Sequence, residues 1–89
     1  MKQIFKYPIE PYTEFITMPQ GAKILHVAEQ CNELFLWAEV DETQPPATRK
    51  IICVGTGMVW DEEEMKLAEY IGTVQQDGFV WHYYDGFQQ

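Results

Sequence analysis

Short segments with alternating apolar and polar side chains recur along this chain, separated by turn residues. In the clearest of them, residues 34–40, one face is aliphatic throughout and the other carries Phe35, Trp37 and Glu39. A two-residue period is typical of a β-strand. Both faces are apolar at the start of the segment, so we expect this strand to be central in its sheet or covered by a second subunit.

The same reading along the whole chain predicts about seven strands. We expect them at Lys2–Ile9, Tyr12–Met18, Ala22–Gln30, Leu34–Val40, in the apolar stretch that begins at Ile51, at about 68–75, and at Phe79–Tyr84. Pro19-Gln20-Gly21 predicts a turn, and Gln76-Asp77-Gly78 is the strongest hairpin signal. Residues 41–48 read as a loop that Pro45-Pro46 stiffens into an extended conformation, and residues 85–89 as a polar tail.

Residues 61–70 allow two interpretations. Asp61 followed by three glutamates has the pattern of a helix N-terminus, whereas Tyr70-Ile71-Gly72-Thr73-Val74 favours a strand. We predict one helical turn near 61–67 followed by a strand. The sequence therefore predicts a single mainly β domain over residues 1–89, built as a small antiparallel sandwich or barrel.

The charge balance restricts the partners that this chain can bind. Its formal net charge is −8, with six basic residues against fourteen acidic ones. Binding to nucleic-acid phosphates needs clustered Lys and Arg, so we do not expect it. The acidity is compatible with a basic protein partner, with mimicry of a nucleic acid's charge, and also with a role in solubility alone.

The ends of the chain and its cysteines indicate a protein of the cytoplasm. No apolar segment of a signal peptide follows the first residues, and no window is long and apolar enough to span a membrane. Cys31 and Cys53 are expected to be reduced, buried or half-buried thiols. Neither has a second cysteine or a histidine at metal-ligand spacing, and the run Asp61–Glu64 reads as a solvated acidic loop, so no metal or cofactor is expected.

The Gly55-Thr56-Gly57 motif is the first place to look for a small-molecule site. Its backbone N–H groups could face an anion, with Arg49 or Lys50 as a clamp. A phosphate loop would normally open a helix and carry a lysine close behind, however, and this one is followed by Met58. A turn or bulge between two strands is the favoured interpretation.

The two histidines do not indicate catalysis. His26 and His82 each lie on a predicted strand, and neither has a nucleophile beside it in sequence. We therefore expect packed or surface histidines, no catalytic residue and no enzymatic activity.

Aromatic side chains are more numerous than a core of this size needs. Phe79, Trp81 and Tyr83 form a stripe on one strand, which Phe35 and Trp37 could join. Such a surplus predicts a surface for self-association or for a partner. We expect a homo-oligomer, a dimer in particular, with these five residues at the interface.

Several short motifs spread over nearly the whole chain resemble landmarks of a family of small phage and prophage proteins. They are Lys6-Tyr7-Pro8, Met18-Pro19-x-Gly21-Ala22-x-Ile24-Leu25, Leu36-Trp37-Ala38-x-Val40-Asp41, Gly55-Thr56-Gly57 and Tyr70-Ile71-Gly72-Thr73. Members of that family often have a histidine after Gly-Thr-Gly, where this chain has Met58. The resemblance implies a phage-related role inside a bacterial cell, such as host takeover or counter-defence, and no particular reaction.

Two functions follow as hypotheses. The first is a non-enzymatic, phage-encoded protein that acts in the host cytoplasm by occupying a host or defence protein. The second is an oligomer that sequesters a small anionic ligand, such as a nucleotide signal, with Gly55-Thr56-Gly57 and Arg49 or Lys50 as donors.

Overall fold

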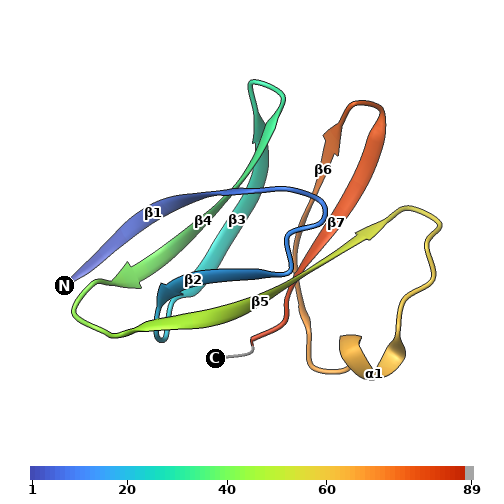
Figure 1. The fold of residues 1–89 in the computed structure, drawn as a ribbon. Coiled ribbons are helices and arrows are strands. Elements are labelled where there is room, and N and C mark those ends of the chain that lie inside the picture. Colours follow the sequence, from blue (N-terminus) through green and yellow to red (C-terminus); the bar gives the residue numbers. More distant parts are fainter. Residues whose placement is uncertain (88–89) are drawn as a thin grey trace.

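In the part of the chain that the structure describes, seven antiparallel strands in two sheets and one short helix make up the fold (Figure 1). The structure is a computed structural model that describes residues 1–87. The elements in chain order are β1 (Lys2–Ile9), β2 (Phe15–Pro19), β3 (Lys23–Gln30), β4 (Glu33–Asp41), β5 (Pro46–Gly55), α1 (Glu62–Met65), β6 (Glu69–Gln76) and β7 (Phe79–Asp85). One sheet has the order β1-β4-β3 and the other the order β2-β5-β7-β6. The predicted mainly β fold is confirmed as a small sandwich, with the single helical turn where the sequence indicated it.

The core lies between the two sheets. From β4, the central strand of its sheet, Leu34, Leu36, Ala38 and Val40 are all at most 1% exposed. The facing sheet contributes Ile51 of β5 and Tyr83 of β7 to the same apolar cluster. Successive side chains of β4 point to opposite faces of the sheet, so these four face the core and Phe35 and Trp37 lie on the outer face of the β1-β4-β3 sheet.

Two tight hairpins set the register of the strands that they join, β3 with β4 and β6 with β7. In the turn between β3 and β4, Cys31 and Asn32 have φ of 54° and 62°, and in the turn between β6 and β7, Asp77 and Gly78 have φ of 52° and 83°. Two central residues with positive φ make the turn that matches the twist of a hairpin. The tips of the hairpins also touch, because Asn32 Nδ2 donates to Asp77 Oδ1 over 3.2 Å.

The long loop predicted before β5 is shorter than expected. Only 42–45 separate β4 from β5, and β5 begins at Pro46, opposite Pro19 of β2. The stretch shows no periodicity and carries two prolines, which indicated a loop, but proline is tolerated as the first residue of a strand. The extended conformation expected of the double proline continues directly into the strand.

Three other local predictions need correction. The predicted strand Tyr12–Met18 begins only at Phe15, because 10–13 form a turn in which Thr13 N donates to Glu10 O over 2.9 Å. Cys31 is exposed because it lies at a hairpin tip, and both cysteines are free. Asp85 belongs to β7 and is buried, so the polar tail begins later; the part of it at 88–89 lies outside the described residues.

Candidate functional site

The Gly55-Thr56-Gly57 motif ends β5 and reverses the chain. Met58 N donates to Gly55 O over 3.0 Å, and Gly57 has φ of 86°, a conformation that favours glycine. The Met58 side chain folds back over the turn, where its Sδ lies 3.2 Å from Gly55 N. A Cβ on Gly55 would come within 2.8 Å of that sulfur and 3.1 Å of the Trp81 ring, so a larger residue here would displace the Met58 side chain from the turn.

The chain does not continue into another strand after this turn, contrary to the interpretation favoured from sequence. Instead, 58–65 run back along the outer face of the β2-β5-β7-β6 sheet, where Ile52 and Val54 of β5 become buried. Asp61 begins α1 by accepting from Glu63 N over 2.9 Å. Glu64 pairs with Lys50 of β5 at 3.4 Å and so ties the segment to the sheet.

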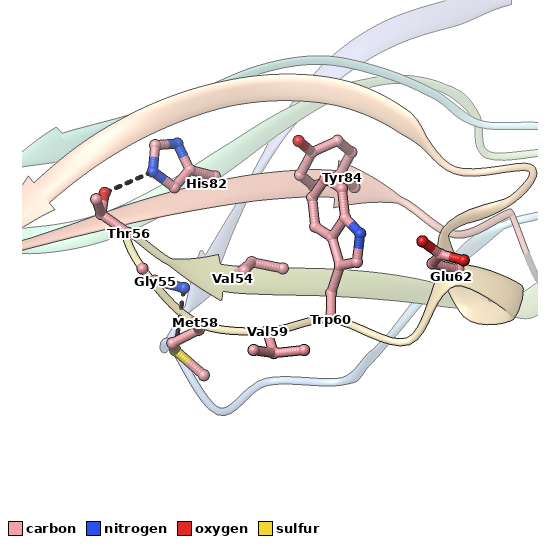
Figure 2. A pocket seen from close by; sticks show the side chains of 10 residues that line it. Val54, Gly55, Thr56, Met58, Val59, Trp60, Glu62, His82 and Tyr84 are labelled. Carbon is pink, nitrogen blue, oxygen red and sulfur yellow. Dashed lines mark hydrogen bonds between the residues drawn. The ribbon is translucent and has the colours of Figure 1, made fainter.

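A pocket of about 530 Å³ opens between this returning segment and the strands (Figure 2). Its wall is largely apolar, with polar groups from Thr56, His82 and Glu62. The lining residues are Val54, Gly55, Thr56, Gly57, Met58, Val59, Trp60, Glu62, His82 and Tyr84. A mostly apolar hollow with a few polar groups is the usual form of a ligand site.

A chain of hydrogen bonds holds His82 in place at one end of the pocket. Its Nε2 lies 2.8 Å from Thr56 Oγ1, and its Nδ1 lies 2.9 Å from Thr73 Oγ1, which in turn bonds to the hydroxyl of Tyr70. Both ring nitrogens are therefore occupied, so the imidazole is held in one orientation. Of the residues in this series of hydrogen bonds, Thr56 and His82 line the pocket.

Two aromatic rings form the other end of the pocket. Trp60 and Tyr84 pack edge to face, with ring centroids 5.6 Å apart and planes at 89°. Tyr70 also packs edge to face against Tyr84, with ring centroids 5.5 Å apart. Figure 2 shows Trp60 and Tyr84 between His82 and Glu62.

Arg49 does not reach this pocket. Its side chain points between the sheets, is 1% exposed, and donates from Nη1 to Asp85 Oδ2 over 2.9 Å and from Nη2 to the Ala22 carbonyl. Burial raises the pKa of the Asp85 carboxyl, and the Phe87 N–H and Arg49 only partly offset this effect. Arg49 therefore has a structural role inside the core, where its buried charge is paired with Asp85.

Lys50 lies on the opposite face of β5, as strand alternation predicts, but it too is outside the pocket lining. Its Nζ is directed to Glu64. The structure therefore brings Thr56 and its flanking glycines to a pocket and leaves both candidate cations elsewhere.

The five candidate interface residues do not form one surface. Tyr83 is completely buried, and Trp81 packs against the core from the same face of β7. Phe79 is 62% exposed and stacks on Trp81. Phe35 and Trp37 lie on the outer face of the other sheet, where Lys6 covers the Phe35 ring at 4.3 Å.

The sequence reasoning did not assign His82, Trp60, Tyr84 and Glu62 to the pocket, and it missed Thr73, which bonds to His82 from outside the lining. One signal was available, because the two-residue turn Asp77-Gly78 places Thr73 directly opposite His82 in the β6–β7 hairpin. No local pattern indicated that Thr56 would arrive beside His82 from a different strand.

Within residues 1–87, no group of three or more His, Cys, Asp or Glu side chains is arranged to hold a metal ion. In the same part of the chain, no helix has the length and apolar character needed to cross a bilayer.

Comparison with known proteins identifies a family but no characterised member. A family model described as a domain of unknown function, DUF7352, matches residues 1–89. No curated protein and no solved structure matches the chain.

Proposed function

The chain belongs to the DUF7352 family of unknown function, and we propose that it is a non-enzymatic binding protein that uses the pocket face to occupy a protein partner. The observation that carries this proposal is the exposed apolar rim of the pocket. Val59 is 96% exposed, Met58 59% and Trp60 45%, and all three are consecutive. Exposed apolar side chains gathered around a hollow are typical of an interaction site.

The rim favours a protein partner over a small ligand alone. A small molecule would need only the hollow, whereas Val59 projects almost entirely into solvent beside it. Tyr70, which is 59% exposed and packs against the Tyr84 ring of the pocket, adds aromatic surface. Apolar and aromatic side chains that gather in this way form the centre of protein interfaces.

The polar groups of the pocket support a binding role without catalysis. Thr56 and His82 are placed as a nucleophile and a base would be, but the second nitrogen of His82 faces the hydroxyl of Thr73. A carboxylate at that position would stabilise the imidazolium formed during catalysis, and a hydroxyl supplies no such charge. We therefore propose that this hydrogen-bonded chain shapes the pocket.

The partner is proposed to be a host or defence protein in the bacterial cytoplasm. The basis is the resemblance of the Lys6-Tyr7-Pro8, Gly55-Thr56-Gly57 and Tyr70-Ile71-Gly72-Thr73 landmarks to small phage and prophage proteins. The net charge of −8 supports a partner with a basic surface.

Affinity capture from bacterial lysate tests this function. The natural chain should retain a stoichiometric partner, and Val59→Asp should lose it, because a charge would enter the apolar rim. Tyr12→Asp is the matched control, since Tyr12 is 80% exposed in the β1–β2 turn and does not line the pocket. Equal capture by the Val59→Asp variant, or no partner for the natural chain in any growth or infection condition, would contradict the proposal.

The alternative, sequestration of a small anionic ligand, has less support. Arg49 and Lys50 are engaged elsewhere, and no Lys or Arg is among the residues that line the pocket. A nucleotide present at 100 times its Kd would stabilise the fold by about 2.7 kcal/mol. A thermal-shift screen that finds such a nucleotide would favour this alternative over the protein partner.

A further inference from the structure

The aromatic end of the pocket has the chemistry that attracts a cation. The faces of tryptophan and tyrosine rings carry negative electrostatic potential, and tryptophan attracts cations most strongly. Trp60 and Tyr84 stand at a right angle with centroids 5.6 Å apart, and both line the pocket. Trp60 is 45% exposed, so a ligand can reach its ring.

A carboxylate without a counterion lies at the same end. Of the four acidic residues in 61–64, Asp61 is used to cap α1 and Glu64 is paired with Lys50. Glu62 lines the pocket and forms no ion pair with any residue of the described chain. The pocket therefore combines aromatic faces with one uncompensated negative charge, in a chain whose net charge is −8.

We propose that the pocket receives an arginine side chain of the protein partner, with the guanidinium between the Trp60 ring and the Glu62 carboxylate. A planar guanidinium stacks on an aromatic ring and donates two hydrogen bonds to a carboxylate, which a lysine ammonium cannot do together. Val54 and Met58 supply apolar wall for the aliphatic stem. The inference rests on the proposed function, since the arginine belongs to the partner.

A pair of isosteric peptides tests the charge requirement. The whole chain is titrated with acetyl-Gly-Arg-Gly-amide and with the citrulline analogue, which has the same shape without the charge. The Trp60 indole N–H signal, assigned by its loss in Trp60→Phe, is followed by NMR. We expect the arginine peptide to shift this signal with saturation and to bind about tenfold or more tightly than the citrulline peptide, with the lysine peptide between them.

Substitutions on α1 supply the second arm. Glu62→Gln should lower the affinity for the arginine peptide by about fivefold to tenfold. Glu63→Gln removes the same charge from the same helix turn, but Glu63 does not line the pocket. The affinity of this variant for the arginine peptide should therefore stay within about twofold of that of the natural chain.

Three results would overturn the arginine site: equal affinity for the arginine and citrulline peptides, no Trp60 shift with either, or equal effects of Glu62→Gln and Glu63→Gln. These results are separable from the capture experiment. If Val59→Asp abolishes capture while the two peptides behave alike, the partner surface stands and the arginine site fails. If Val59→Asp leaves capture unchanged, the partner surface itself fails.

Discussion

Tyr83 places a phenol at the centre of the core, with its hydroxyl beside the weakly polar Cys53 thiol. The residue is 0% exposed, and its Oη has no hydrogen-bond partner within the described chain, although the half-buried Cys53 thiol lies beside it. Burial raises the pKa of the Tyr83 hydroxyl above its ordinary value of 10.0, and burial also raises the pKa of the Cys53 thiol above 9.0. Both groups are therefore kept neutral by the fold.

We expect Tyr83→Phe to stabilise the protein at pH 7 by about 1 kcal/mol, because it removes a buried hydroxyl without a partner. Both pKa values are higher in the folded state, so their contribution to stability is complete below about pH 9 and is lost as the pH rises beyond that value. Tyr83→Phe should reduce the loss of folding stability above pH 10. Urea unfolding at pH 7, 9 and 10.5 measures this effect.

The exposed Tyr12 supplies the control for the Tyr83 substitution. Tyr12→Phe removes the same atom from a side chain that is 80% exposed, and it should leave the unfolding midpoint unchanged. A Tyr83→Phe variant that is less stable than the natural chain at pH 7 would show that the buried hydroxyl does form a useful hydrogen bond.

At the scale of elements, β3 and β6 join the two sheets at their edges. Gly72 of β6 lies against Val27 of β3, and a Cβ on Gly72 would approach Val27 Cγ1 to 2.9 Å. The register of the β6–β7 hairpin shifts at the same place, between Tyr70 and Gly72. The absence of a side chain at Gly72 therefore sets how closely the sheets approach.

Gly72→Ala should cost about 1–3 kcal/mol of stability because the added methyl overpacks this junction. Val27→Ala should cost stability on its own by leaving a cavity. In the double variant each change relieves the other, so the combined loss should be smaller than the sum by at least about 0.5 kcal/mol. Urea unfolding of the four proteins measures the coupling, and simple additivity would contradict direct contact between the sheets at this point.

At the scale of the whole molecule, the sandwich absorbs part of the aromatic surplus that motivated a dimer. Tyr83 and Trp81 are explained by the core, whereas Phe35 and Trp37 remain on the outer face of the β1-β4-β3 sheet. Their rings pack together at 6.2 Å, and His26 lies 6.0 Å from Trp37 on the neighbouring strand. We expect the predicted dimer to form through this face.

Light scattering at micromolar concentration should give twice the 10.5 kDa mass of the chain. Trp37→Asp should halve that mass without unfolding the protein, because the charge enters the apolar face that a two-fold dimer would bury. Phe79→Asp is the control on the other sheet, where the side chain is 62% exposed, and it should leave the dimer intact. A mass near that of one chain for the natural protein would rule out the dimer.

Local sterics and periodicity predicted the number and type of the elements, although they misplaced the start of β2, the start of β5 and the end of β7. Alternation in 34–40 predicted that Leu34, Leu36, Ala38 and Val40 share one face of β4, and Asp77-Gly78 predicted a turn that also aligns Thr73 with His82. The cap at Asp61 likewise predicted α1. These features depend on φ, on side-chain direction and on neighbours in sequence, so the sequence by itself determined them.

Only the tertiary structure decided the site, because its contacts join residues far apart in the chain. Thr56 meets His82 across 26 positions, and Arg49 meets Asp85 across 36. Strand alternation allowed Arg49 either face of its sheet, and burial beside Asp85 removed it from the candidate pocket. The return of 58–65 over β5, which buries Val54 and creates the pocket, depends on packing against a sheet that does not exist until the strands have paired.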